Sequence, residues 1–268
     1  MRPIVFMTDF GLRDPYVGEM KGVAASLAPG APIIDLTHDV PKFGIAYAAY
    51  VLRLSYRYFP QGSVFVVVVD PTVGSERRAL AIRGRRYFFV GPDNGVLVPA
   101  AEDDGIAEVV SLDPGRAGLP RVSPSFHGRD LFTPAAARIA AGADLKALGD
   151  PVDPSSLVRV EVPPRAPRVS GEGVVTEVFH VDDFGNVVTW ASMKDVDELL
   201  GLKIGDVVVV NGVRCRRVRA FSHVRPGECA LYESSYLLAE LAVFMGSAAD
   251  ALGVRPGDRI VISWPTPR

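Results

Sequence analysis

The sequence predicts an α/β protein: an N-terminal α/β domain with a mostly parallel central sheet, followed by a C-terminal antiparallel β-barrel domain. Up to residue 160, short apolar runs alternate with longer segments of helical periodicity, which is typical of a parallel sheet covered by helices. A stretch rich in Pro and Gly, Glu161–Gly173, then interrupts the chain. Beyond it, short alternating segments are separated by tight turns, as in a small barrel. We therefore expect domains at 1–162 and 173–268, with a linker at 163–172.

In the N-terminal domain, each expected strand is followed by a helix of 10 to 15 residues or by a turn. The run Val64–Val69 is apolar without interruption, so it predicts a strand that is buried on both faces of the sheet. The other expected elements are strands at Pro3–Met7 and Ile33–Leu36, helices at Tyr16–Leu27, Ile45–Tyr58 and Leu131–Ala141, and a hairpin of Leu80–Ile82 with Tyr87–Val90.

The C-terminal domain contains only short segments of β character. Its turns are Asp182–Asn186, Asn211-Gly212 and Pro256–Asp258, and their composition favours tight reversals of the chain. The expected strands are Val174–Val181, Val187–Trp190, Val207–Val210, Val213–Val218 and Arg259–Ser263.

Composition and charge exclude several function classes. The 268 residues include 29 basic and 31 acidic side chains, so nothing in the balance predicts nucleic-acid or membrane binding. The densest basic run lies on an expected hairpin strand and is interpreted as a solvated face; it comprises Arg214, Arg216, Arg217 and Arg219. No signal-peptide pattern and no apolar run near ~20 residues is present, and we expect a cytoplasmic protein.

Cysteine and histidine spacing predicts no metal site. Cys215 and Cys229 match no metal or redox motif, and a chain of this size needs no disulfide, so we expect reduced thiols. The four histidines are scattered without the spacing of ligands. No Gly-rich dinucleotide fingerprint, Walker sequence or esterase elbow is present, so the common α/β enzymes are excluded.

Two strings place ionisable groups where an α/β sheet keeps its active site. DPTVGSERR, Asp70–Arg78, follows the buried strand, so Asp70 would lie at the carboxyl end of a central parallel strand. FHGRD, Phe126–Asp130, lies in a loop just before an expected helix. Either string alone is equally consistent with a solvated loop. Their occurrence together with further motifs favours a site.

Polar residues also follow strands in both halves of the chain. Asp9 ends the first strand, where a carboxylate can accept hydrogen bonds from a vicinal diol such as a ribose; a turn or capping role is the alternative. Phe184 supplies a stacking face, and the Asn186 amide can pair with an adenine edge. A plain hairpin turn at Asp182–Asn186 is the alternative there.

Taken together, these strings resemble the S-adenosyl-L-methionine hydroxide adenosyltransferase family, which is related to fluorinating and chlorinating enzymes that attack the same carbon. The resemblance covers nearly the whole chain. The matching strings are TDFG (Thr8–Gly11), YVGEMK (Tyr16–Lys21), DLTH (Asp35–His38), DPTVGSERR, PDNG (Pro92–Gly95), FHGRD, DDFGN (Asp182–Asn186) and MGSAA (Met245–Ala249). Two departures are Thr72, where the family has glycine, and Phe244, where it has asparagine.

The resemblance implies a set of site residues. The charged set of the family's hydrolases falls on Asp70, Arg77 and His127. The substrate-binding set comprises Asp9 at the ribose, Phe184, Asn186, Phe221 and the Met245 backbone at the adenine, and Ser235 and Glu240 near the amino-acid end. It further implies a homotrimer with sites between subunits, and S-adenosyl-L-methionine as the substrate without any cofactor or metal.

The implied reaction is attack of water or hydroxide on the ribose C5′, giving adenosine and L-methionine. Arg77 stays protonated and can stabilise a developing hydroxide, whereas His127 or Asp70 can accept the proton. Two alternatives remain open: a halide-dependent adenosyltransferase, and a non-enzymatic protein that binds adenosine or S-adenosyl-L-methionine.

Overall fold

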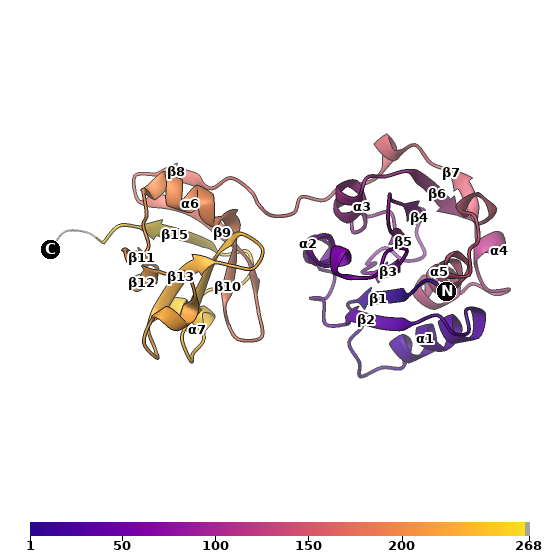
Figure 1. Ribbon diagram of the computed structural model, residues 1–268, viewed down its shortest axis with the longest axis horizontal. Helices are drawn as coiled ribbons and strands as arrows, with labels where there is room; N and C mark the ends of the chain where they lie inside the picture. Colours follow the sequence, from indigo (N-terminus) through magenta and orange to yellow (C-terminus); the bar gives the residue numbers. More distant parts are fainter. Residues whose placement is uncertain (266–268) are drawn as a thin grey trace. The chain divides into compact units, whose positions relative to one another are not determined.

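The computed structural model describes residues 1–265 of the chain. The chain divides into two compact units: unit 1, Met1–Val162, and unit 2, which begins at Pro163. Each unit is described by itself below (Figure 1).

Unit 1 contains a seven-stranded sheet in the order β2-β1-β3-β5-β4-β6-β7. β1, β2, β3 and β5 are parallel, whereas β4, β6 and β7 extend the sheet in antiparallel fashion. The predicted parallel core of the sheet is therefore confirmed. The strands are β1 (Ile4–Thr8), β2 (Ile33–Thr37), β3 (Val64–Val68), β4 (Ala79–Arg83), β5 (Phe88–Pro92), β6 (Glu108–Leu112) and β7 (Gly149–Pro151).

Helices cover both faces of this sheet, and α2 and α5 lie on opposite sides of β1 and β3 (Figure 1). The helical elements are α1 (Tyr16–Leu27), α2 (Ile45–Ser55), η1 (Tyr56–Tyr58), α3 (Val98–Asp104), α4 (Pro114–Ala117), η2 (Gly128–Phe132), α5 (Thr133–Ala140), η3 (Leu145–Ala147) and η4 (Pro154–Ser156). The α1 bounds match the expected helix. The expected helix at Leu131–Ala141 is divided into a π-helical turn, η2, and the α-helix α5.

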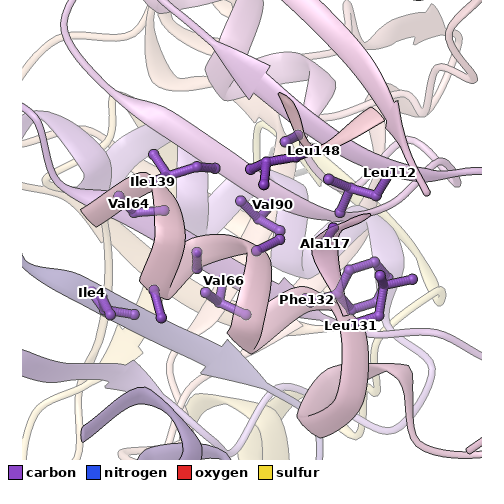
Figure 2. Close-up of a cluster of buried hydrophobic side chains, with 14 of the residues drawn as sticks. Ile4, Val64, Val66, Val90, Leu112, Ala117, Leu131, Phe132, Ile139 and Leu148 are labelled. Atoms are coloured by element: carbon purple, nitrogen blue, oxygen red, sulfur yellow. The ribbon is translucent and has the colours of Figure 1, made fainter. Parts of the chain in front are cut away.

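The core of unit 1 is packed on each side of β3. All five β3 residues are buried because this strand lies in the centre of the sheet with helices on both faces. Figure 2 shows one of the two clusters, in which Val64 and Val66 of β3 lie beside Phe132 of η2 and Ile139 of α5. This packing fixes the helical segment that directly follows the FHGRD histidine.

Unit 2 is a closed barrel. Its sheet has the order β10-β14-β13-β12-β11-β15-β9-β8, and a further pairing of β10 with β9 closes seven strands. All neighbouring pairs are antiparallel except β12 with β13. The strands are β8 (Arg168–Ser170), β9 (Gly173–Val181), β10 (Val187–Ser192), β11 (Val207–Val210), β12 (Val213–Arg217), β13 (Cys229–Glu233), β14 (Leu238–Val243) and β15 (Arg259–Ser263).

Several elements of unit 2 differ from the expectation. β13 and β14 were not predicted, although both are almost wholly buried and apolar, because their sequences lack a clear two-residue alternation. β8 lies within the predicted linker and pairs with β9. The unit also contains α6 (Met193–Leu200), η5 (Phe221–His223) and α7 (Ala248–Leu252).

The expectation of reduced thiols is wrong. Cys215 and Cys229 form a disulfide, with their Cα atoms 4.4 Å apart. The two residues are direct partners in the parallel pairing of β12 and β13. Their 14-residue separation gave no indication of this, because only the register of the two strands brings them together.

The interpretation of the basic run as a uniformly solvated face is also wrong at one position. Arg214 and Arg216 are exposed, but Arg217 has the opposite orientation and is only 8% exposed. Its guanidinium donates to both carboxylate oxygens of Asp197, at 2.8 and 2.7 Å. Successive side chains of a strand point to opposite faces, so one arginine of the run is held inside the fold.

Within residues 1–265, no helix has both the length and the apolar character needed to cross a membrane.

Candidate active site

The candidate site of unit 1 lies at one edge of its sheet. Asp9 follows β1, Asp70 follows β3 after a single residue, and Asn94 follows β5. Because these three strands are parallel, their carboxyl ends meet at the same edge, where open α/β sheets bind ligands.

Arg77 reaches this edge from a strand that runs in the opposite direction. It lies two residues before β4, and β4 is antiparallel to β5 with Ala79 opposite Pro92. The beginning of β4 is therefore beside the end of β5, which brings Arg77 back toward Asp70.

Three of the predicted site residues form one hydrogen-bonded group. The Arg77 Nε donates to both Asp70 oxygens at 3.0 Å, and its Nη2 donates to Asp70 Oδ2. The same Nη2 lies 2.8 Å from His127 Nδ1. The Asp70 and Arg77 side chains are only 4% and 8% exposed. Arg77 also lies over the Phe132 ring at 5.4 Å. The two charged strings, far apart in the sequence, therefore meet in space.

The contact with Arg77 decides which nitrogen of His127 carries its proton. A guanidinium is always protonated and only donates, so Nδ1 must accept and the neutral ring carries its proton on Nε2. Burial lowers the pKa of His127 and the charge of Arg77 lowers it further, whereas Asp70 and Asp130 oppose this. The neutral ring, with Nε2–H directed away from Arg77, is therefore the favoured form.

An irregular helical turn presents His127. The residue precedes η2, a π-helical turn, and the Thr133 hydroxyl donates to the Gly128 carbonyl within it at 2.7 Å. Single π-helical turns are rare and occur frequently at functional sites. A Cβ on Gly128 would lie 3.3 Å from both Met20 Sδ and the Phe126 ring, so a larger residue would displace the turn from β3 and α1.

The other two arginines of the two strings have structural partners. Arg78 donates to Asp93 at 2.7 Å and to the Ser156 carbonyl at 2.6 Å, which fixes the PDNG turn. Arg129 pairs with Asp130 at 2.6 Å and with Glu19 at 2.8 Å. Neither arginine contacts the Asp70–Arg77–His127 group, so the two strings divide into site residues and supporting residues.

The loop after Asp70 tolerates the threonine at position 72. Thr72 has an ordinary negative φ, and the positive φ of this loop belongs to Gly74, at +84°. A Cβ on Gly74 would approach the Pro124 carbonyl to 2.8 Å. Glycine is therefore required at position 74 and not at position 72. The Asn94 amide donates to the Val69 carbonyl at 2.8 Å, which holds the residue before Asp70.

Asp9 is held by the segment that follows β2. Its Oδ2 accepts from the Phe43 backbone N–H at 2.9 Å, and the Lys42 ammonium donates to its carbonyl. The residue is 7% exposed. Its Oδ1 accepts no hydrogen bond from any residue in 1–265, so one carboxylate oxygen is available to a ligand.

The predicted adenine-binding residues lie in unit 2. Phe184 is 81% exposed at the turn between β9 and β10, which leaves its ring face open. The Asn186 amide instead donates to Asp182 Oδ2 at 2.9 Å, and Asp182 Oδ1 accepts from two backbone N–H groups of the same turn. Asn186 therefore shapes the turn with one amide N–H and keeps its second N–H and its side-chain oxygen for another partner.

Phe221 and Glu240 belong to one cluster, together with Tyr232 and Phe244. The Phe221 ring lies 6.2 Å from Tyr232 and 6.3 Å from Phe244, and it is half exposed. Tyr232 donates its hydroxyl hydrogen to Glu240. Burial raises the pKa of Glu240 and the Asp182 charge raises it further, against the hydrogen bond from Tyr232, which lowers it. The Phe244 departure therefore adds an aromatic ring to this cluster.

Ser235 and Met245 lie in exposed turns of unit 2. Ser235 is at the tip of the β13–β14 hairpin, and Met245 follows β14. Met245 is 82% exposed and has a φ of 59°, which is uncommon for a residue with a side chain. The next residue, Gly246, donates its N–H to the Val243 carbonyl at 3.0 Å, which closes a tight turn around Met245.

Sequence reasoning did not single out the residues that support these groups. Asn94 belongs to the PDNG string, to which the sequence alone assigns no role, and no motif includes Lys42 or Phe43. The DLTH string was quoted without a role, although His38 is 4% exposed and hydrogen-bonded at both ring nitrogens. No group of three or more potential ligating side chains for a metal ion occurs among residues 1–265.

Comparison with known proteins places this geometry in a family. Residues 4–149 match the model of the SAM hydroxide adenosyltransferase N-terminal domain, and residues 176–261 match that of its C-terminal domain. The chain is 41% identical over 264 residues to a protein of Thermus thermophilus named (R)-S-adenosyl-L-methionine hydrolase, and the match covers 96% of this chain and 98% of that protein.

Two further relatives are informative. The crystal structure of an uncharacterized conserved protein from Thermotoga maritima has a TM-score of 0.86 and 37% identity, covering 97% of this chain and 99% of that one. A protein of an Actinoplanes species named fluorinase is 28% identical over 222 residues, or 73% of each chain. Since both domain models match in order and span most of the sequence, the chain belongs to the SAM hydroxide adenosyltransferase family.

Proposed function

We propose that this chain hydrolyses S-adenosyl-L-methionine at the ribose C5′, giving adenosine, L-methionine and one proton. The observation that carries the proposal is the buried Asp70–Arg77–His127 group at the carboxyl edge of the sheet. Relatives named (R)-S-adenosyl-L-methionine hydrolase, with which the chain aligns over nearly its full length, support the same activity.

The substrate is already activated for this reaction. In S-adenosyl-L-methionine the C5′ atom is bonded to a positive sulfonium, and the leaving group is a neutral thioether. Water forms a bond to C5′ as the C5′–S bond breaks and its electron pair returns to sulfur. The charge is dispersed in the transition state, so a pocket of low dielectric does not oppose the step.

The hydrogen bonds of the group suggest a role for each residue. His127, with its proton on Nε2, would donate to the attacking water and hold it in place. Arg77 would stabilise the negative charge that develops on the water oxygen, an effect of up to about 3–4 kcal/mol for a preorganised donor. Asp70 keeps lone pairs that Arg77 does not use and would accept the proton.

This assignment favours Asp70 over His127 as the proton acceptor. Nε2 already carries a proton and cannot accept another, whereas acceptance at Nδ1 would require Arg77 to move away and would leave a doubly protonated ring beside its guanidinium. As the bond from the water oxygen to C5′ forms, the water becomes more acidic, so Asp70 can take its proton while Arg77 stabilises the negative charge left on the oxygen. A strong base is therefore not needed.

We further propose that Asp9 binds the ribose diol, that Phe184, Phe221 and the backbone at Met245 contact the adenine, and that the Asn186 amide hydrogen-bonds to it. Ser235 and Glu240 would lie near the amino-acid end. The chain would act as a homotrimer with its sites between subunits, in the cytoplasm, without metal or cofactor. The Cys215–Cys229 disulfide is the feature that weighs against a reducing compartment.

One product assay tests the activity. Purified protein, dialysed against a chelator, is incubated with S-adenosyl-L-methionine with and without chloride or fluoride, and the products are separated by chromatography. We expect adenosine and methionine in every case. A 5′-halo-adenosine would support the halide-dependent reaction instead, and unchanged substrate would support a binding protein. Activity that returned only on adding zinc or magnesium would contradict the metal-free mechanism.

A further inference from the structure

A chain of hydrogen bonds runs through unit 1 directly behind Asp9. The Lys21 ammonium donates to Asp35 Oδ2 at 2.6 Å, and Asp35 Oδ1 lies 3.0 Å from His38 Nε2. The other ring nitrogen of His38, Nδ1, lies 2.9 Å from the Thr8 hydroxyl. That hydroxyl oxygen in turn accepts from the Phe10 backbone N–H at 3.2 Å. The chain therefore ends on the two residues that flank Asp9.

The ionised state of Asp35 orients these hydrogen bonds. Burial disfavours the Asp35 carboxylate, but hydrogen bonds from Lys21 and His38 outweigh it and lower the pKa of Asp35, so this group is ionised and accepts. His38 must then donate from Nε2, and in the neutral ring Nδ1 accepts from the Thr8 hydroxyl. With its hydrogen committed to His38, the Thr8 oxygen is left to accept from Phe10.

Local backbone geometry brings these groups together. The pairing of β1 with β2 shifts register between Phe6 and Met7, because Asp35 is opposite Phe6 whereas Thr37 is opposite Met7. Leu36 is therefore an extra residue, as in a β-bulge, and bulges redirect the side chains that follow them. His38 is consequently directed inward, where it is 4% exposed, and its carbonyl accepts from the Gly11 N–H at 2.8 Å.

The opposite side of Asp9 is fixed by a strained residue. Phe43, whose N–H donates to Asp9 Oδ2, has a φ of 63°, a rare conformation for a bulky side chain. Such conformations persist only where the surrounding structure enforces them, and they concentrate at ligand sites. Asp9 is thus held by Phe43 at one carboxylate oxygen and by Thr8 and Phe10 through the main chain.

We propose that His38 is a positioning residue: through Thr8 it fixes the backbone on both sides of Asp9, so that the free carboxylate oxygen faces the 2′- and 3′-hydroxyls of the substrate. The inference rests on the proposed function, in which Asp9 binds the ribose. His38 itself contacts no substrate. Loss of the hydrogen bonds between His38, Thr8 and Phe10 should weaken recognition of the diol and leave the Asp70–Arg77–His127 chemistry intact.

The diagnostic quantity is the preference for the diol, defined as the ratio of the dissociation constants of 2′,3′-dideoxyadenosine and adenosine, measured by calorimetry. A merely structural role for His38 would weaken both ligands equally and leave this ratio unchanged. Asp9→Asn gives the reference value for impaired diol recognition. Because the measurement needs no turnover, it separates failure of this inference from failure of the proposed hydrolysis, which the product assay reports for the unaltered protein.

Thr8→Val removes the hydroxyl at nearly constant volume, and His38→Ala removes its partner. We expect each to reduce the diol preference about tenfold, toward the Asp9→Asn value. Loss of a hydrogen bond to a charged group weakens binding by about this factor. In the hydrolysis assay KM should rise by a similar factor, with kcat within about threefold. Thr8→Ser restores the hydroxyl and should restore the preference.

Tyr56→Phe is the matched control. It removes a partly buried side-chain hydrogen bond of the same unit, to Asp103 at 2.6 Å, before the amino end of β3. We expect it to lower stability without altering the diol preference. If Thr8→Val and His38→Ala do not fold, Asp35→Ala provides the test. The Asp35 side chain is 39% exposed, and its removal leaves His38 Nε2 without its acceptor. A wild-type diol preference in folded Thr8→Val, His38→Ala or Asp35→Ala protein would overturn the proposal.

Discussion

His127 is the residue whose chemistry depends most on its neighbours. Alone it would titrate near 6.5 and could act as either acid or base. Beside the permanently charged Arg77 it becomes an acceptor at Nδ1 and a donor at Nε2. One contact thus converts a candidate base into a hydrogen-bond donor, the role that the proposed mechanism uses to hold the water.

We expect His127→Ala and Arg77→Ala each to lower kcat by roughly two orders of magnitude or more, because in the proposed mechanism both groups act on the attacking water. Binding of adenosine should change little, since neither residue is assigned to adenine or ribose. Kinetics together with calorimetry test this. A loss confined to affinity, with kcat preserved, would contradict the assignment.

The lowered pKa of His127 gives a pH dependence of defined sign. Protonation at Nδ1 would oppose the Arg77 N–H, so kcat/KM should fall only when the pH drops below the ordinary value of 6.5, and be level above it. The free energy of unfolding should change in the same direction. Because the pKa of His127 is lower in the folded state, the unfolded chain binds this proton more readily, and stability is lost as the pH falls below 6.5.

Arg77→Gln tests the cause of the lowered pKa of His127, because it removes a charge that lowers this pKa and leaves Asp70, which raises it. NMR titration of His127 should therefore show its pKa moving up; an unchanged or lower value would refute this account.

At the scale of elements, the β12–β13 pair connects stability to the proposed adenine contact. The disulfide closes the segment between Cys215 and Cys229, and Phe221 in η5 lies inside that closed loop. Closing a loop restricts the unfolded chain, which stabilises the fold. It also limits how far the loop that carries Phe221 can move from Tyr232.

Cys215→Ser with Cys229→Ser should lower the free energy of unfolding by about 2–4 kcal/mol, a typical value for loss of a disulfide. Denaturant unfolding with and without a reductant measures it, and the reductant should have no effect on the double variant. In the hydrolysis assay, we expect the double variant to have a higher KM with little change in kcat, because η5, which carries Phe221, is less restrained without the disulfide. Equal stability of the oxidised and reduced protein would show that the disulfide contributes nothing.

At the scale of the whole molecule, the two groups of proposed site residues are divided between the units. Asp9, Asp70, Arg77 and His127 belong to unit 1, whereas Phe184, Asn186 and Phe221 belong to unit 2. A ring of head-to-tail contacts would repeat one interface between successive chains. Each complete site of such a trimer would take unit 1 from one chain and unit 2 from its neighbour.

Complementation tests the shared site. One inactive variant carries His127→Ala, and the other carries Phe184→Ala with Asn186→Ala. Unfolded and refolded together in equal amounts, they should recover roughly a quarter of wild-type activity, because random mixing joins two intact halves with that frequency. Each variant refolded alone is the control. No recovery in assemblies proved to be mixed would show that every site lies within one chain.

The sequence by itself determined the parts of this protein that depend on local pattern. The apolar run Val64–Val69 required a central strand, and the period of Tyr16–Leu27 defined a helix whose bounds the structure reproduces. Polar residues directly after strands located the edge at which Asp9 and Asp70 lie, because strand direction alone fixes that edge. The order of the motifs indicated the family.

Tertiary structure decided everything that depends on register or on proximity between distant segments. The Cys215–Cys229 disulfide exists because β12 and β13 run parallel and in register, which no spacing reveals. The inward orientation of Arg217 depends on its face of the strand. The proton of His127 is placed by an arginine 50 residues away, and the link from His38 to Thr8 spans 30 residues. A hydrogen bond acts over about 3 Å, so only the folded chain determines which donor meets which acceptor.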